Sequence, residues 1–411
     1  MIGISSSTNP NPNPNPNRLF LLNLLCIIGF GLVAMTICLP SMPSWSKVFS
    51  TNQANVQLSF SSFVIAFGLT QVIYGPLSDR YGRRRLLAFG FALASVGSIM
   101  AAMAPSLPSL TFARFLQGAG AGAGMVLGRA LVQDHFSGSD RARVMAYVGM
   151  AMGLCAPLAT VIGGQVHVYF GWRANFWVIG ALAATLMVTT WIGLPVDARA
   201  RCNENYWFRD MLNAYRQLIR VPAFVAFTGV VALSTGPFYV FLAGTPSVLA
   251  NYGVGPSEVG FFIMVVPFSY IAGNFLTSRL IKRFDETELM FIGQCFGLFS
   301  VCLVLAMALV GIHSPFAVAG PLILLGLGQG LLIPTALAGT VNVVPALAGA
   351  AAGIAGLLQQ LSGAFGGYAI GFFDNDTAVE MALFMIVFIL VAFACQLWLR
   401  RIQTYPERND T

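Results

Sequence analysis

The sequence predicts an all-α membrane protein with 12 transmembrane helices, and three observations carry that prediction. Of the 411 residues, 57% are hydrophobic and only 9% are charged, whereas a soluble globular protein carries roughly 25% charged residues. The chain divides into 12 apolar runs, each near the length of about 20 residues that a helix needs to cross a bilayer. Its basic residues lie mostly in the short connections between these runs, as they do in membrane proteins of fixed orientation.

A low-complexity tail comes first, because the Asn-Pro alternation within residues 1–17 favours a disordered chain. The longest polar stretch, Val196–Arg220, is expected to be a linker with amphipathic character around Tyr206–Ile219. The expected spans cover residues 19–39, 56–76, 86–104, 108–133, 144–166, 174–195, 221–243, 257–278, 288–311, 315–336, 347–372 and 378–399. The domains predicted from them are the tail 1–17, a six-helix bundle in 18–195, the linker 196–220, a second six-helix bundle in 221–400 and a C-terminal tail in 401–411.

The distribution of basic residues predicts the orientation of these spans. Of the 22 basic residues, only Lys47 and Arg173 fall on the outer side of the topology, and Arg114 and Arg129 lie within the fourth span. All the others share one side with the N-terminus, and an excess of Lys and Arg marks the cytoplasmic side. We therefore expect a multi-pass protein of the inner (cytoplasmic) membrane with both termini in the cytoplasm. The net charge of +7 reflects this orientation and not a nucleic-acid site.

The connection after the second span concentrates charge: residues 75–85 read GPLSDRYGRRR. Such charge belongs where water reaches, so the segment is expected to be an aqueous hairpin, with Gly82 at the tight reversal. A positive-inside loop and no more is one interpretation. However, the combination resembles the G-x-L-[AS]-D-R-x-G-R-[RK] signature of the major facilitator superfamily. The candidate gating residues are Gly75, Asp79, Arg80, Gly82, Arg83 and Arg84.

This resemblance implies the major facilitator fold, in which two pseudo-symmetric six-helix bundles rock about a central cavity. It also implies a role for Asp79, which in relatives engages the N-terminal end of the eleventh helix across the bundle interface. A carboxylate is favourable at a helix N-terminus. The contact is expected to latch the cytoplasmic side in the outward-open state.

Two further patterns match the superfamily. Arg114 and Gln117 lie in the fourth span in an R-x-x-Q-G pattern, and an intramembrane arginine must face protein or a water-filled cavity because lipid exposure is costly. Arg114 is therefore expected either to line a cavity or to tie helices together. The fifth span resembles the antiporter motif, with Ala156 before Pro157 where Gly-Pro is usual; close helix packing is the alternative explanation. Its motif residues are Gly149, Gly153, Pro157, Gly163 and Gly164.

The most detailed resemblance is to the Bcr/CflA (bicyclomycin/chloramphenicol-resistance) subfamily of drug:proton antiporters. Residues 128–136 read GRALVQDHF and residues 170–177 read FGWRANFW. The sequence departs from the subfamily at Thr36, where an aspartate is usual. A threonine cannot exchange a proton near neutral pH. No acidic residue lies near the middle of a predicted span, and Asp134 is the deepest candidate.

The candidate substrate and coupling residues follow from these patterns. Arg114 and Arg129 are fifteen residues apart and within about 60° of each other around a helix, so both can face one positively charged cavity. Asp134 is expected either to couple protons or to pair at the interface with Arg141 or Arg143. Polar residues of other spans are expected either opposite Arg129 or in helix–helix hydrogen bonds. The candidates, with Gln117 and Thr36, are Arg114, Arg129, Asp134, Tyr239, Asn274, Gln329 and Gln359.

The function predicted from the sequence is secondary active, proton-coupled efflux of small organic molecules by a monomer in the lipid bilayer. A dedicated exporter of a metabolite or organic anion, such as a siderophore, is the alternative that Thr36 supports. A non-transporting membrane receptor is disfavoured because it has no use for gating motifs. We expect no enzyme activity, cofactor, metal or nucleic-acid partner, since the three histidines form no cluster and no catalytic or phosphate-binding motif appears.

Overall fold

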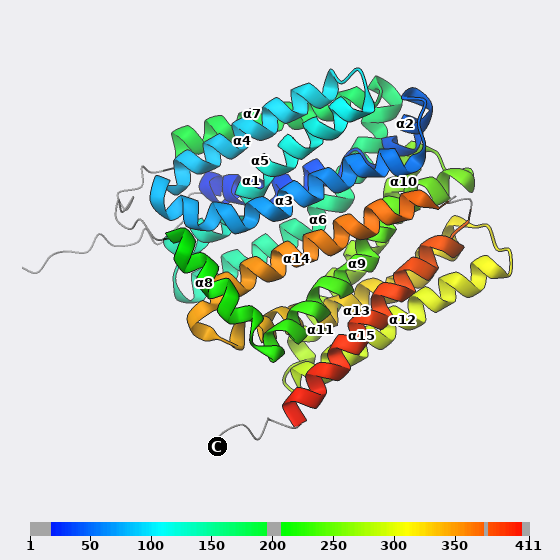
Figure 1. Ribbon diagram of the computed structural model, residues 1–411. Helices are drawn as coiled ribbons and strands as arrows, with labels where there is room; N and C mark the ends of the chain where they lie inside the picture. Colours follow the sequence, from blue (N-terminus) through cyan, green and yellow to red (C-terminus); the bar gives the residue numbers. More distant parts are fainter. Residues whose placement is uncertain (1–17, 195–206, 374–376, 405–411) are drawn as a thin grey trace, which may run out of the picture.

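The computed structural model describes residues 18–194, 207–373 and 377–404. The predicted tail 1–17, part of the linker and residues 405–411 lie outside the described residues. Within the described ranges, every regular element is helical, and the helices pack lengthwise (Figure 1). The first half of the chain comprises α1 (Arg18–Thr36), η1 (Leu39–Ser41), α2 (Met42–Val48), α3 (Gln53–Tyr81), α4 (Arg83–Ala102), α5 (Leu107–His135), α6 (Gly138–Phe170) and α7 (Trp172–Gly193).

The second half begins after a helix in the predicted linker, α8 (Trp207–Ile219), which coincides with the predicted amphipathic segment. Leu218 of α8 is buried and Ile219 is exposed, so the helix lies against the bundle with one face outward. The remaining elements are α9 (Pro222–Asn251), α10 (Pro256–Ile263), α11 (Val265–Leu280), α12 (Glu286–Leu309), α13 (Pro315–Asn342), η2 (Pro345–Leu347), α14 (Ala348–Ala369), η3 (Ile370–Phe372) and α15 (Val379–Thr404).

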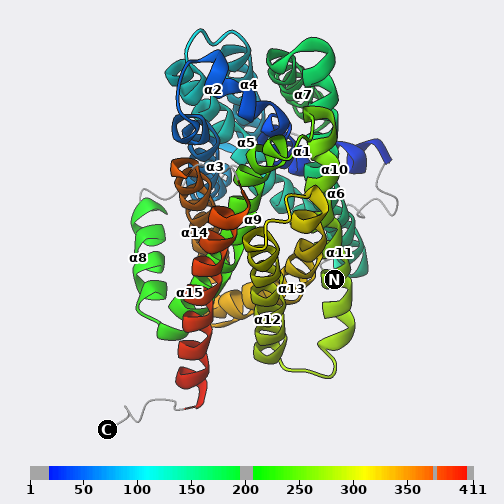
Figure 2. The same ribbon diagram turned by 90° about the vertical axis from the view of Figure 1, so that its right-hand side faces the viewer.

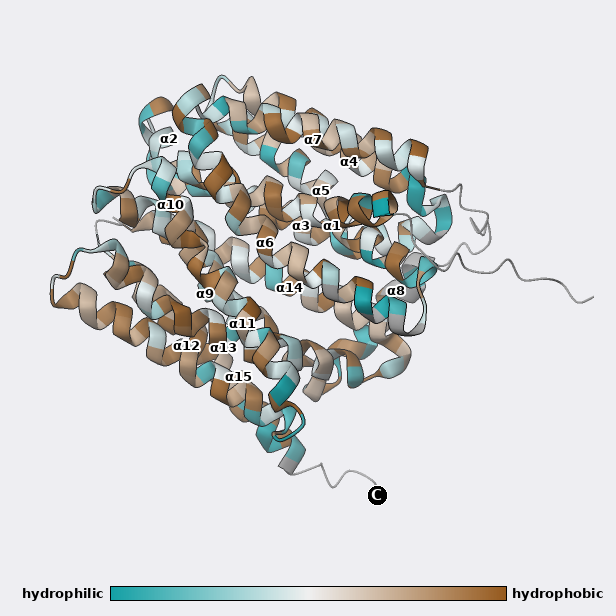
Figure 3. Cartoon of the chain, turned by 180° about the vertical axis from the view of Figure 1, so that it is seen from behind, coloured by the Kyte–Doolittle hydropathy of each residue, from teal (hydrophilic) through white to brown (hydrophobic). Residues whose placement is uncertain are grey.

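In the part of the chain that the structure describes, eleven helical segments are long and apolar enough to cross a membrane. The first joins α1, η1 and α2, and the eighth joins α10 and α11. The predicted span that is missing from this set is the eleventh, 347–372, which corresponds to α14, whose glycines and central Gln359–Gln360 pair lower its hydropathy. Hydrophobic residues occupy most of the length of the helices, and hydrophilic ones gather toward their ends (Figure 3).

The helices form two six-helix bundles. Helices α1 to α7 pack mainly on one another, and so do α9 to α15; Figure 2 shows the first group above the second. The halves meet where α3 packs on α14 and where α6 packs on α10 and α11. We call the end of the bundle that carries the 49–52 and 252–255 loops the closed end, and the opposite end, where α1 begins and α15 finishes, the terminal end.

Candidate functional site

The two halves are joined by hydrogen bonds at the closed end. On one side of the seam, Gln57 of α3 donates to the Ala243 carbonyl of α9 at 2.8 Å. Close by, the Ser61 hydroxyl of α3 donates to the Ala364 carbonyl of α14 at 2.8 Å. Both donors are buried, and a buried donor that loses its acceptor costs about 1–3 kcal/mol. These bonds hold the closed end shut.

The other side of the seam is formed by the antiporter-motif helix α6, which approaches α10 and α11 at its glycines. A Cβ atom on Gly164 would lie 2.3 Å from the Pro256 carbonyl oxygen, and one on Gly153 would lie 2.6 Å from Ile271. Gln165 adds a hydrogen bond of 3.3 Å to the Ser257 carbonyl. Gly164 therefore permits contact with the backbone of the other half, and Gly153 makes room for the Ile271 side chain.

The remaining motif residues have different surroundings. A Cβ on Gly163 would lie 1.9 Å from the Ile37 carbonyl oxygen, so Gly163 packs on the segment after α1 and not on the other half. Gly149 has open space around it, with no atom within 4 Å of a Cβ. Pro157 lies inside α6, where a proline removes one backbone hydrogen bond and favours a bend.

Arg129 lies between the halves. It is six residues from the end of α5, which places it about 9 Å from the terminal end at 1.5 Å per residue. Protein surrounds the Arg129 side chain, yet the side chain is exposed to solvent, so it lines an interior space. Its Nη2 lies 3.4 Å from the Met152 sulfur of α6. Among the described residues, no carboxylate forms an ion pair with it.

The second half contributes to the same space. Arg129 lies near Tyr270 of α11, and the Tyr270 side chain is hydrogen-bonded to Asn274, one turn further along. The structure thus brings together two sequence-predicted residues, Arg129 and Asn274, from opposite halves. Tyr270 and Met152 were not among the predicted site residues. The sequence marks Tyr270 as a polar residue inside an apolar run, expected to point into the bundle, whereas nothing in the sequence distinguishes Met152. We call this space, lined by Arg129, Met152, Tyr270 and Asn274, the chamber.

Arg114 has a different environment, although it lies on the same helix. Its side chain is fully buried, and Nη1 donates to the Ala34 carbonyl at 2.9 Å while Nη2 reaches the Met35 carbonyl at 3.5 Å. It also donates to Gln117, which in turn donates to the Ser98 hydroxyl at 2.7 Å. The structure therefore does not bring Arg114 and Arg129 into one cavity.

The break in the first span explains the position of Arg114. Helix α1 ends at Thr36, and Pro40 has no N–H with which to continue the hydrogen-bonding pattern. The carbonyl groups of the last turn of a helix need other donors, and the Arg114 guanidinium supplies them. Its flat face also lies 4.3 Å above the centre of the Phe63 ring, a favourable cation–π contact.

Thr36 is buried at the same break and also ties helices together. Its hydroxyl lies within hydrogen-bond distance of two carbonyls, that of Leu32 at 2.9 Å and that of Ala156 in α6 at 3.2 Å. A hydroxyl can donate to these oxygens, whereas an ionised carboxylate cannot. The surroundings of this position therefore suit the threonine that replaces the usual aspartate.

The other candidates of the second half lie mostly in helix contacts. Tyr239 is buried and its hydroxyl donates to Gln360. Gln329 is buried and donates to the Ser234 carbonyl at 3.0 Å. Gln359 is half-buried. Asn274 is therefore the predicted partner of Arg129 that lies at the chamber, through its hydrogen bond with Tyr270.

At the terminal end, Asp134 forms an ion pair with Arg83, with 2.8 Å between the Arg83 Nη1 and Asp134 Oδ2 atoms. The pairing with Arg141 or Arg143 that the sequence suggested is not found. Arg141 donates to the Phe136 carbonyl at 2.9 Å, and Arg143 lies 3.9 Å from Asp140. The observed ion pair joins the end of α5 to the beginning of α4.

The hairpin between α3 and α4 is as tight as predicted. Gly82 alone separates the two helices, with a φ of 87° that residues with a side chain rarely adopt. Gly75 has only Val126 near it, at 4.0 Å from a Cβ. Arg80 stacks on the Tyr81 ring and Arg84 on the Trp191 ring. The Asp79 side chain lies outside the described part of the structure.

Two six-helix bundles that enclose a solvent-accessible cation, with a seam closed at one end, define a membrane transporter. The family model of the Major Facilitator Superfamily matches residues 19–367, and the chain belongs to this superfamily.

Three relatives also agree with the Bcr/CflA resemblance. Multidrug resistance protein D of Escherichia coli (strain K12) is 27% identical over 360 residues, which cover 83% of this chain and 85% of the relative. The bicyclomycin resistance protein homolog of Haemophilus influenzae is 24% identical, over 86% of this chain and 89% of the relative. The chloramphenicol resistance protein of Pseudomonas aeruginosa is 24% identical, over 87% of this chain and 85% of the relative.

Two solved structures share the fold. The D-xylose-proton symporter has a TM-score of 0.73 at 15% identity and covers 92% of this chain and 98% of that one. A bacterial homolog of the human lysosomal transporter Spinster, in an inward-facing and unoccupied conformation, has a TM-score of 0.74 at 14% identity and covers 95% of this chain and 99% of that one.

Proposed function

We propose that this protein exports small organic molecules across the cytoplasmic membrane, driven by protons that flow inward, through alternating access of its chamber. The relatives named for resistance to bicyclomycin, chloramphenicol and multiple drugs support export. The distribution of basic residues supports an orientation in which the terminal end faces the cytoplasm. In that orientation the closed end seals the chamber from the outside, and the protein is in the state that loads substrate.

The observation that carries this proposal is the position of Arg129, a cation with no carboxylate partner in the described residues, held between the halves and open to solvent. A negative group 4 Å from a guanidinium gains about 4 kcal/mol at an effective dielectric constant of about 20, before desolvation is counted. Substrates with an anionic, zwitterionic or neutral polar group are therefore favoured over permanent cations. Met152 and Tyr270 supply an adaptable apolar wall and an aromatic face beside the charge.

Proton coupling is assigned to Asp134. No acidic residue lies near the middle of a predicted span, and Asp134 lies on the same helix as Arg129. In the present state its carboxylate is paired with Arg83. We infer that the ion pair forms when a proton is released to the cytoplasm and separates when Asp134 takes up a proton in the outward-facing state.

A dedicated exporter of an organic anion, not coupled through the first helix, is the second candidate. The observation that favours it is the environment of Thr36, whose hydroxyl is committed to backbone carbonyls. Susceptibility profiling separates the candidates. Resistance to several unrelated compounds supports multidrug export, whereas loss of one secreted metabolite in a deletion strain supports the dedicated carrier.

Proteoliposomes with an imposed pH gradient test the proposal directly, with a panel of anionic, zwitterionic, neutral and cationic amphiphiles as substrates. We expect uptake into vesicles that hold inside-out protein, and an acidic interior should accelerate this uptake. Uptake should be strongest for the anionic, zwitterionic and neutral compounds. Transport of no compound under any gradient, or transport of permanent cations alone, contradicts the proposal.

A further inference from the structure

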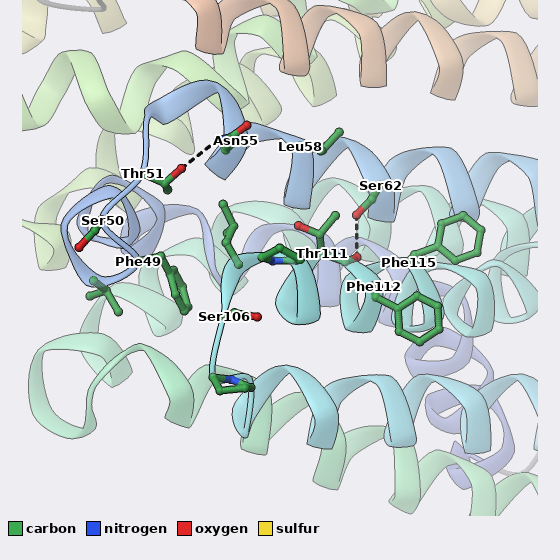
Figure 4. Close-up of a pocket in the computed structure, with 14 residues that line it drawn as sticks. Phe49, Ser50, Thr51, Asn55, Leu58, Ser62, Ser106, Thr111, Phe112 and Phe115 are labelled. Atoms are coloured by element: carbon green, nitrogen blue, oxygen red, sulfur yellow. Dashed lines mark hydrogen bonds between the residues drawn. The ribbon is translucent and has the colours of Figure 1, made fainter.

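A second cavity, of about 850 Å³, lies at the closed end between the beginnings of α3 and α5 and the loop that follows α2 (Figure 4). Its size is within the range of about 300–1,000 Å³ that small-ligand sites occupy. It is separate from the chamber, because α3 and α5 are in direct contact behind it. Ser62 donates to the Thr111 carbonyl at 3.1 Å, and a Cβ on Gly118 would lie 2.3 Å from the Phe63 carbonyl oxygen.

The cavity carries hydroxyl groups at its loop end and aromatic rings further along the helices, although Phe49 also lies at the loop end. Ser50 and Ser106 lie at its loop end, and Phe112 and Phe115 lie further along α5 (Figure 4). Phe115 is nine residues beyond Ser106, which is about 14 Å along a helix. Half of the hydrocarbon core of a bilayer is about 15 Å thick. The cavity therefore extends from the level of the loops into the hydrocarbon of one leaflet.

The wall of the cavity opens to the side of the bundle. Leu58 of α3 is 40% exposed, and Phe112 and Phe115 of α5 are 57% and 39% exposed. These residues lie within helices that are long and apolar enough to span the membrane. In a membrane, their exposed faces meet lipid and not water.

The polar groups of the cavity are neutral donors. No residue that lines it carries a charge. The hydroxyls of Ser50 and Thr111 make no hydrogen bond within the described residues, while Asn55 donates to the Thr51 hydroxyl at 2.9 Å. Ser50 also has a φ of 50°, the only positive value for a residue other than glycine in the described ranges; such strain clusters at binding sites. Uncharged donors suit ester carbonyl oxygens, which only accept hydrogen bonds.

From this arrangement we propose that the cavity is a binding site for one phospholipid of the leaflet at the closed end. The glycerol-ester region lies on the Ser50 and Thr111 hydroxyls, and one acyl chain runs along Leu58, Phe112 and Phe115. Because the lining carries no charge, the site recognises the ester region and acyl chain, and not the charge of the headgroup. The site depends on the fold alone and not on the transport direction.

Photocrosslinking in vesicles tests the site. The full-length protein is reconstituted with phosphatidylethanolamine that carries a diazirine near the ester end of one acyl chain, illuminated, digested and analysed by mass spectrometry. We expect labelling to be concentrated on residues 48–62 and 105–115. Phosphatidylglycerol with the same diazirine is expected to label these segments within about threefold of the same yield.

Two leucines of α3 provide a matched pair of variants. Leu58 lines the cavity and is 40% exposed, and Leu69 lies outside it and is 41% exposed. Leu58→Trp places a bulky ring where the acyl chain is proposed to lie and is expected to lower labelling of the two segments at least fivefold, while Leu69→Trp leaves it unchanged. Thr111→Val, which keeps the volume, is expected to lower labelling at least twofold. Equal labelling in Leu58→Trp and Leu69→Trp, or labelling by phosphatidylglycerol alone, overturns the proposal.

Discussion

Arg114 and Arg129 lie on one helix, but their charges have different surroundings. Arg114 is fully buried, and its donors satisfy the carbonyls that the break in α1 leaves free. Arg129 has neither a carboxylate partner in the described residues nor a set of carbonyls around it, and solvent reaches it. An intramembrane charge is costly. The hydrogen bonds of Arg114 offset that cost, whereas for Arg129 the proposed substrate would supply the missing partner.

Replacing Arg129 tests this distinction. Arg129→Gln keeps a polar side chain but removes the charge, and we expect at least a tenfold loss of apparent affinity for anionic substrates, which corresponds to about 1.4 kcal/mol. Arg129→Lys keeps the positive charge and should retain part of the affinity for anionic substrates. The measurement is substrate-concentration dependence in proteoliposomes, with Arg173→Gln at the closed end as control. Unchanged affinity in Arg129→Gln removes this residue from the substrate site.

Replacing Arg114 should lower the stability of the protein and leave its substrate preference unchanged. Arg114→Met fills similar space but leaves the Ala34 carbonyl and Gln117 without their donor, at about 1–3 kcal/mol for each orphaned group. We expect a lower midpoint of thermal unfolding in detergent and an unaltered order of substrate preference among the molecules that remain folded. A Met variant as stable as the parent chain means that the hydrogen bonds at the α1 break contribute little.

The Asp134–Arg83 ion pair allows the coupling assignment to be examined. Asp134→Asn keeps the side-chain size but cannot take up and release a proton in this cycle. We expect substrate binding to persist and the acceleration by a pH gradient to disappear. Asp140→Asn, which removes a second ion pair, with Arg143 at 3.9 Å, is the matched control. Full proton-driven transport by the Asp134 variant excludes Asp134 as the coupling residue.

The sequence pattern identified these polar residues but not their partners. An arginine or glutamine within an apolar run is visible at once, and its confinement to the protein interior follows from the cost of lipid exposure. Whether Arg114 faces a cavity depends on where α1 ends, 80 residues away along the chain. The helical angle between Arg114 and Arg129 carries no information about that break.

At the scale of helices, α6 separates the roles of glycines that look alike in the sequence. Gly153 and Gly164 contact the second half, Gly163 contacts the segment after α1, and a Cβ on Gly149 would meet no atom of another element within 4 Å. The motif therefore combines a contact between halves with packing inside one half. Pro157 lies between these contacts, where a bend in α6 changes how its two ends meet their neighbours.

Enlarging Gly164 should open the closed end. In Gly164→Val the side chain meets the Pro256 carbonyl, since even a Cβ would lie 2.3 Å from it. The check is the distance between spin labels on Lys47→Cys and Asn251→Cys in a background without other cysteines. We expect a longer and broader distribution in Gly164→Val and no change in Gly149→Val. Identical distributions would falsify the role of this contact in closure.

For the whole molecule, the sequence predicted the helices and their order well because burial in a membrane imposes long apolar runs. The predicted second span, 56–76, is shorter than α3 (Gln53–Tyr81) because helices continue beyond the apolar core into polar residues. The relative position of the halves was not predictable. It depends on contacts such as Ser61 with Ala364, which are 303 residues apart.

The central claim is that one chamber between the halves opens to each side of the membrane in turn. Its most direct test uses Asn274→Cys, near Arg129, in protein from which the native cysteines have been removed. The protein is reconstituted in vesicles in one orientation, and a membrane-impermeant maleimide is applied to either side. Before a gradient is imposed, labelling is expected from the side of the terminal end. With substrate and a pH gradient, labelling is expected from both sides, and a disulfide between Ser61→Cys and Ala364→Cys should abolish labelling from the closed end. Labelling from one side alone under every gradient and substrate contradicts alternating access.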